Sequence, residues 1–147
     1  MVHTPGQAYL WNAVGAELRA MGHSTAFVAR DDWKVTTLLE HLGISYASYG
    51  EAGRSAAAKV ARLPLCGVRA FADTCRVRPD VIVGTGLIEA YVGLLLRRPV
   101  LVFEDSELTP CVERAQWQRL ATAIVTPSCF KRDLGRRHLV VEGYKEL

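Results

Sequence analysis

The sequence lacks a long hydrophobic run and a block of charge of one sign. Its longest apolar stretches, such as Val81–Val83 and Tyr91–Leu96, are far shorter than the roughly 20 residues of a membrane-spanning helix. The 18 lysines and arginines are nearly balanced by 15 acidic residues, with the two signs interspersed. We therefore expect no membrane span and no nucleic-acid partner, because short basic clusters are usually solvated faces or helix ends.

Cysteine is scarce. Its four residues, Cys66, Cys75, Cys111 and Cys129, form no Cys-x-x-Cys pair, and no histidine pair stands at zinc-finger spacing. The sequence therefore predicts no structural metal site. We expect buried thiols in a reduced, cytoplasmic environment, since no basic and apolar leader opens the chain.

The chain does have the apolar content of a folded domain. Half of its 147 residues are apolar and 22% are charged, a composition typical of globular proteins and unlike that of disordered chains. This length matches one ordinary domain with one hydrophobic core.

Helical and extended patterns alternate along the chain. Trp11, Val14, Leu18 and Met21 recur at steps of three and four residues, which predicts a helix over 6–21 with these residues on its apolar face. Further helices are predicted at 33–42, 87–96, near 112–120 and from Thr126 onward. The stretch 56–77 is also predicted to be helical, but in two pieces, because Pro64 interrupts the helix. Strands are predicted at 24–30, 44–49, 81–83, 100–103 and 123–125.

This alternation predicts an α/β fold of three layers, with a mostly parallel sheet, right-handed crossovers and helices on both sides. Its beginning is unusual because only Met1-Val2-His3 precede the first helix. The first strand commonly lies in the middle of a doubly wound sheet. We therefore expect that this strand is largely missing, and that the true start lies upstream or the chain is a fragment.

Several sequence segments resemble an archaeal glycosyltransferase-like family that is catalogued as a domain of unknown function. They follow one another in the same order as in that family and cover essentially the whole chain. The matching segments are His3–Asn12, Glu17–His23, Ala29–Asp31, Phe103–Glu107, Ile124–Pro127, Asp133–His138 and Glu142–Glu146.

The resemblance implies the amino-terminal half of a GT-B-type fold, related to UDP-N-acetylglucosamine 2-epimerases and sugar transferases. In such folds the carboxy-terminal domain usually holds the nucleotide-sugar, and the amino-terminal domain shapes the acceptor side. Residues 1–135 would be the Rossmann-like domain, and residues 136–147 would begin the crossover to a carboxy-terminal domain that is absent. The sequence departs from the family where Gln7-Ala8-Tyr9 replace an additional histidine.

Loops that follow strands are the candidate ligand sites, because open α/β sheets bind ligands beyond the carboxyl ends of their strands. The first such loop leads into the first helix, whose amino end offers backbone N–H groups to an anion or a sugar oxygen. An ordinary helix cap is the alternative. We assign substrate binding there to His3, Thr4, Gly6 and Gln7.

A second loop, Gly84-Thr85-Gly86, also joins a strand to a helix. It is not a dinucleotide fingerprint, because Glu89 stands where Gly-x-Gly-x-x-Gly has its third glycine, and the chain has no P-loop motif. These three residues are predicted to contact substrate hydroxyl or phosphate groups, with a plain tight turn as the alternative.

The third loop, Glu104-Asp105-Ser106-Glu107, gathers carboxylates at the end of a strand. Such carboxylates bind sugar hydroxyls, hold a divalent cation or act as a general base, although solvated carboxylates or helix caps are the common alternative. We predict Glu107 or Asp105 as the catalytic base, and Glu104 and Ser106 as substrate-binding residues.

The expected function is transfer of a sugar from a nucleotide-sugar, bound mostly by the absent domain, to an acceptor on these three loops. A nucleotide-sugar epimerase is the nearest alternative, and a non-catalytic sugar- or nucleotide-binding or interaction module is another. The isolated chain is expected to be inactive. No cofactor or metal ligand is predicted, and the sequence leaves open a need for a divalent cation, the sugar, the acceptor and the oligomeric state.

Overall fold

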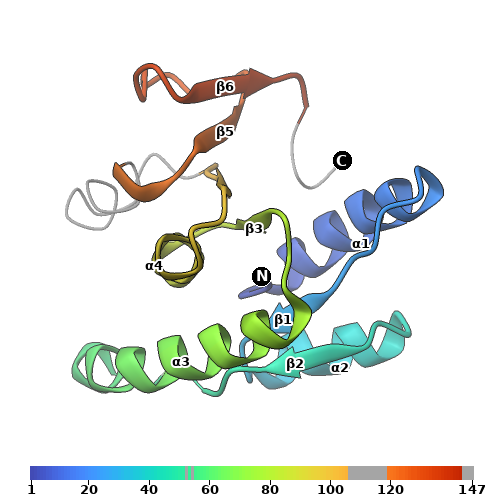
Figure 1. Cartoon of the computed structure of the whole chain (residues 1–147), viewed down its shortest axis with the longest axis vertical. Helices are drawn as coiled ribbons and strands as arrows, with labels where there is room; N and C mark the ends of the chain where they lie inside the picture. The colour runs from blue at the N-terminus through green and yellow to red at the C-terminus, as the bar shows by residue number, and fades with distance from the viewer. Residues whose placement is uncertain (52, 54, 106–118, 144–147) are drawn as a thin grey trace. The chain divides into compact units, whose positions relative to one another are not determined.

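The computed structural model describes residues 1–51, 53, 55–105 and 119–143. The chain divides into two compact units, unit 1 over Met1–Val77 and unit 2 from Arg78 onward. Each unit has a sheet of its own (Figure 1). All strand pairs among the described residues are parallel, which confirms the predicted α/β class.

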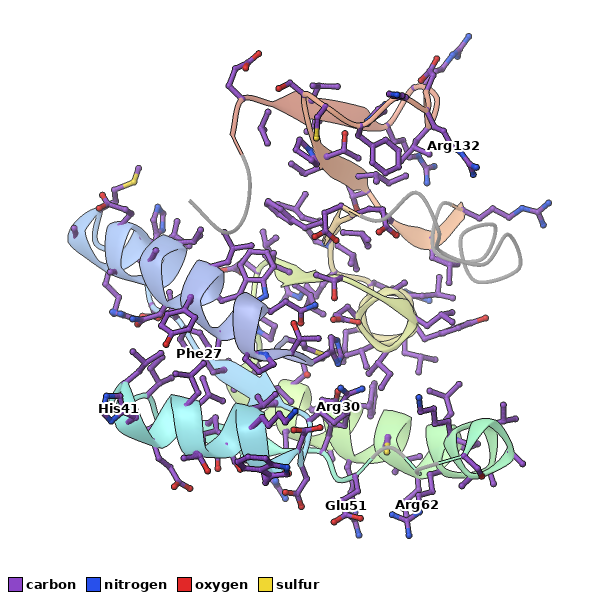
Figure 2. All side chains as sticks on the ribbon, turned by 180° about the vertical axis from the view of Figure 1, so that it is seen from behind. Phe27, Arg30, His41, Glu51, Arg62 and Arg132 are labelled. Atoms are coloured by element: carbon purple, nitrogen blue, oxygen red, sulfur yellow. The ribbon has the colours of Figure 1, made fainter. Side chains whose placement is uncertain are left out.

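Unit 1 alternates helices and strands as predicted. Its elements are α1 (Pro5–Ala20), β1 (Phe27–Ala29), α2 (Trp33–His41), β2 (Tyr46–Ser48) and α3 (Ala56–Val77). β1 and β2 pair in parallel, and in place of a first strand the chain has a single parallel bridge from Val2 to Ala29. Figures 1 and 2, which view the molecule from opposite sides, show α3 on one side of these strands and α2 on the other.

α1 begins where the local chemistry favours a helix. The Thr4 side chain caps it and Pro5 occupies its first turn, where the missing amide proton costs nothing. Its buried face differs from the predicted one, because Val14 and Met21 are exposed and Gly15 is buried. The absence of a side chain at Gly15 lets α1 approach the ring of Phe27 on β1, since an added Cβ would come within 3.2 Å of that ring.

α3 is one continuous helix, and the prediction that Pro64 divides it was wrong. Three small residues on its second half, Cys66, Ala70 and Thr74, are buried at intervals of four, and α3 contacts both β1 and β2. Packing of this half against the strands outweighs the local cost of the proline. On the exposed side, Arg62 forms an ion pair of 3.2 Å with Glu51 (Figure 2).

Unit 2 is built on a four-stranded sheet in the order β3-β4-β5-β6. Its elements are β3 (Ile82–Gly84), α4 (Leu87–Leu96), β4 (Val100–Phe103), β5 (Ala123–Pro127) and β6 (His138–Val141). α4 contacts β3 and β4. The core of this unit is aliphatic, as predicted for parallel strands covered by helices, and includes Ile82, Val92, Val100, Val102 and Ile124.

The end of unit 2 differs from the sequence prediction. Thr126 and Pro127 do not begin a helix but complete β5, where they lie opposite Val140 and Val141 of β6. The β6 strand was not predicted, and it lies within the stretch 136–147 that was assigned to a crossover. The predicted helix near 112–120 lies outside the described residues, except that Arg119 and Leu120 are helical.

The cysteines only partly match the expectation of buried thiols. Cys66 is buried and Cys75 is half-buried, but Cys129 is exposed, and Cys111 lies outside the described residues. Across the part of the chain that the structure describes, no helix combines the length and apolar character needed to span a bilayer.

Candidate functional site

The carboxyl ends of the extended segments in unit 1 bring three polar side chains to one edge. His3 directly follows Val2, Arg30 directly follows β1, and Tyr49 directly follows β2. Backbone hydrogen bonds hold this edge, from the Arg30 N–H to the Val2 carbonyl (2.9 Å) and from the Tyr49 N–H to the Ala29 carbonyl (3.1 Å). Since the segments run in parallel, residues that follow them lie at the same edge.

Gln7 shapes the loop that precedes α1. Its buried side-chain oxygen accepts a hydrogen bond of 2.7 Å from the His3 backbone N–H. The Gln7 backbone N–H in turn donates to the Thr4 hydroxyl at 3.4 Å, which is the reciprocal pattern of a capping box displaced by one residue. The four residues predicted to bind substrate here, His3, Thr4, Gly6 and Gln7, therefore lie together.

Tyr49 holds the His3 ring. Only 1% of Tyr49 is exposed, and its hydroxyl is hydrogen-bonded to His3 Nδ1. The two rings meet edge to face, with centroids 5.8 Å apart and planes at 62°. This contact fixes the orientation of the imidazole ring.

Arg30 completes the same edge. Its Nη2 donates a hydrogen bond of 2.6 Å to the carbonyl oxygen of His3, and Figure 2 labels it at the end of β1. Neither Arg30 nor Tyr49 was assigned to the site from the sequence, although each is the last residue of a predicted strand. The rule that selected the three loops would have found both residues if it had been applied to every strand end.

The other two predicted loops lie at the carboxyl edge of unit 2. β3 and β4 are neighbours, with Gly84 opposite Val102, so Gly84-Thr85-Gly86 and Glu104-Asp105 follow adjacent strands. Glu104 is buried and its N–H donates to the Val125 carbonyl at 2.9 Å, whereas Asp105 is exposed. Ser106 and Glu107, the other members of this predicted group, lie outside the described residues.

Glu89 explains the first glycine of the second loop. The Glu89 side chain is fully buried, and its Oε1 accepts a hydrogen bond of 3.1 Å from the Thr85 N–H. A Cβ added at Gly84 would overlap the Glu89 carboxylate, whereas a Cβ at Gly86 would lie 3.7 Å from it, an ordinary contact. Gly84 therefore makes room for Glu89, whereas Gly86 has space for a side chain.

We expect Gly84→Ala to destabilise the chain by about 1–3 kcal/mol, the usual cost of overpacking a core. Gly86→Ala is the matched control and should change the free energy of unfolding by less than about 1 kcal/mol, because its Cβ has room. Urea unfolding followed by circular dichroism measures both. Equal losses of unfolding free energy in the two variants would show that Glu89 is not the reason why position 84 requires glycine.

The helices α1 and α4 thus begin in the same way. In each, the side chain at the third helical position accepts the backbone N–H of the residue four positions before it, Gln7 from His3 and Glu89 from Thr85. Both acceptors are buried. In each unit an extended segment and a short loop therefore lead into a helix whose amino end is held by a side chain from its own first turn.

Unit 2 also holds a histidine away from the predicted loops. His138 Nδ1 accepts the Leu134 N–H at 3.2 Å, so Nε2 carries the proton and donates to the buried Thr126 hydroxyl at 2.7 Å. This arrangement ties β6 to β5. Within the described ranges, no three histidine, cysteine, aspartate or glutamate side chains are grouped to hold a metal ion.

Comparison with known proteins identifies the fold. No protein-family model matches the sequence, and no curated protein matches it. Among solved structures, MurG from Acinetobacter baumannii matches with a TM-score of 0.73 and 20% identity over 97% of this chain and 45% of that chain. The UDP-GlcNAc 2-epimerase from Methanocaldococcus jannaschii matches with a TM-score of 0.63 and 12% identity over 86% of this chain and 38% of that chain.

A putative UDP-N-acetylglucosamine 2-epimerase from Listeria monocytogenes gives a TM-score of 0.60 and 11% identity over 85% of this chain and 37% of that chain. The chain spans less than half the length of each of these three proteins. Its fold is that of the amino-terminal half of a GT-B protein.

Proposed function

We propose that the chain is the acceptor-side half of a GT-B-type glycosyltransferase that transfers a sugar from a nucleotide-sugar. The observation that carries the proposal is the match of 97% of the chain to MurG. In this proposal residues 1–135 belong to the Rossmann-like domain together with β6, which pairs with β5, and the chain after β6 leads toward a second domain that holds the nucleotide-sugar.

The chemistry that this half supplies is deprotonation of the acceptor hydroxyl. Asp105 is exposed two residues after the end of β4, where a carboxylate can reach a bound acceptor, and Glu107 follows two residues later in the sequence. Glu104, Ser106, Thr85 and the backbone at Gly84 and Gly86 are the proposed contacts to substrate hydroxyls at that edge. A general base of this kind typically contributes a factor of about 10²–10⁴ to the rate.

Transfer assays on the full-length protein test this role. Asp105→Asn or Glu107→Gln should lower kcat for release of the nucleoside diphosphate by about 10²–10⁴-fold, because the base is removed. Asp80→Asn is the matched control, since Asp80 is 98% exposed and lies before β3 rather than after a strand. Full activity in both base variants would reject the assignment of these carboxylates.

An epimerase-like reaction is the second candidate, because two of the matched structures are described as UDP-GlcNAc 2-epimerases. Incubation with UDP-sugars in the absence of any acceptor separates the two reactions. A transferase leaves the sugar stereochemistry unchanged, whereas an epimerase inverts one carbon, which proton NMR detects. Binding of a UDP-sugar without turnover in either assay would instead favour a non-catalytic module.

A further inference from the structure

We propose that Arg30 forms an anion-binding subsite at the carboxyl edge of unit 1, beside His3 and Tyr49, which takes a phosphate group of the substrate. Arg30 is half-buried, and its Nη2 is held by the His3 carbonyl oxygen at 2.6 Å. Its Nε is buried and has no hydrogen-bond partner among the described residues. A guanidinium group has five N–H donors, and within the described residues the bond to His3 is the one that the Arg30 side chain donates.

The charge of Arg30 also lacks a counter-ion within the described parts of the chain. No carboxylate in residues 1–51, 53, 55–105 or 119–143 forms an ion pair with it. The nearby Asp32 carboxylate instead caps α2, where it accepts the Lys34 N–H at 3.0 Å. A partly buried cation without a partner is costly, and an anionic ligand would supply the missing charge.

The surroundings of Arg30 favour an anion over a neutral group. The carbonyl that orients Arg30 belongs to His3, two residues before α1 begins at Pro5, and the amino end of a helix carries a partial positive charge. The acceptor that closes the turn is the neutral amide of Gln7, so no carboxylate competes there. Tyr49 and His3 add a phenol and an imidazole at the same strand ends.

A planar guanidinium matches phosphate oxygens with two parallel hydrogen bonds. That the anion is a phosphate rests on the proposed function, because sugar transfer from a nucleotide-sugar involves substrates that carry phosphate. The presence of an anion site rests on the geometry of Arg30 alone. The phosphate has two possible sources, the diphosphate of the donor and a phosphate on the acceptor.

Isothermal titration with inorganic pyrophosphate, at constant ionic strength set with sodium chloride, tests the subsite without any turnover. Wild-type protein should bind pyrophosphate, and Arg30→Gln should bind it on the order of 10–100-fold more weakly, the effect of losing hydrogen bonds to a charged group. Arg62→Gln is the control, because it removes the same positive charge from an exposed arginine that is already paired with Glu51. It should bind as wild type does.

Arg30→Lys is a second variant in case Arg30→Gln fails to fold. It keeps the positive charge and loses only the planar guanidinium with its paired N–H donors. It should bind pyrophosphate more weakly than wild type and more strongly than Arg30→Gln. Parallel titrations with UDP and with glucose 1-phosphate separate the sources, since tighter binding of UDP indicates the donor and tighter binding of glucose 1-phosphate indicates the acceptor.

Two results would overturn the proposal: pyrophosphate binding to wild type that Arg30→Gln leaves intact, or no binding to wild type. Neither result depends on sugar transfer. A protein that binds pyrophosphate through Arg30 but transfers no sugar would retain the subsite and refute only the proposed function.

Discussion

Gly93→Ala is expected to lower the free energy of unfolding of the chain by about 1–3 kcal/mol, even though alanine favours helix more than glycine does. Gly93 lies inside α4 and faces β4. A Cβ at this position would overlap the Val100 side chain and lie 3.1 Å from the Arg98 carbonyl oxygen. Val100 is almost fully buried on a strand between β3 and β5, so neither side has room to yield.

The chain supplies its own control for this prediction. Gly67 lies inside α3, and a Cβ there would meet nothing within 4 Å. Gly67→Ala should therefore stabilise the chain by about 0.5–1 kcal/mol through helix propensity alone. Val100→Ala, introduced together with Gly93→Ala, should recover part of the loss. If both glycine variants shift the urea midpoint in the same direction, the close approach of α4 to β4 is not real.

Pro64→Ala is expected to raise the free energy of unfolding by about 1–3 kcal/mol, since proline costs roughly 3 kcal/mol in a helix interior. Pro64 is the ninth residue of the 22-residue α3 helix. It lacks the amide proton that would donate to the Val60 carbonyl. Its side chain is exposed, so no packing is lost on substitution.

Chemical denaturation of wild type and Pro64→Ala measures this gain. Leu65→Ala is the control, because Leu65 is an exposed apolar neighbour in the same helix and its removal should change stability by no more than about 0.5 kcal/mol. A drop in stability for Pro64→Ala would mean that the proline sets a bend on which the packing of Cys66 and Ala70 depends.

The regular elements were predictable where the local pattern and the long-range contacts agree. The apolar runs at Val81–Val83 and Val100–Phe103 supply the neighbouring strands β3 and β4. The helices that precede Gly22 and Gly43 end within two residues of these glycines. α3 departs from the prediction because packing on β1 and β2 outweighs a local breaker. β6 departs because its partner β5 specifies it, and a pattern read from one segment contains no information about its partner.

The candidate site could be predicted only as a set of strand ends. The rule placed His3–Gln7 together in unit 1, and Gly84–Gly86 beside Glu104 and Asp105 in unit 2. It did not reveal that Tyr49 would meet the His3 ring, because this hydrogen bond joins residues 46 positions apart. It also did not reveal that Gly84 accommodates Glu89. In the sequence, Glu89 was noted only because it stands where the dinucleotide-binding motif has its third glycine.

The shared design of the α1 and α4 amino ends has an electrostatic consequence. Gln7 closes one turn with a neutral amide, and Glu89 closes the other with a carboxylic group, so the two helix ends differ by one potential negative charge. The end at α1 keeps its attraction for anions, while an ionised Glu89 cancels that attraction at α4.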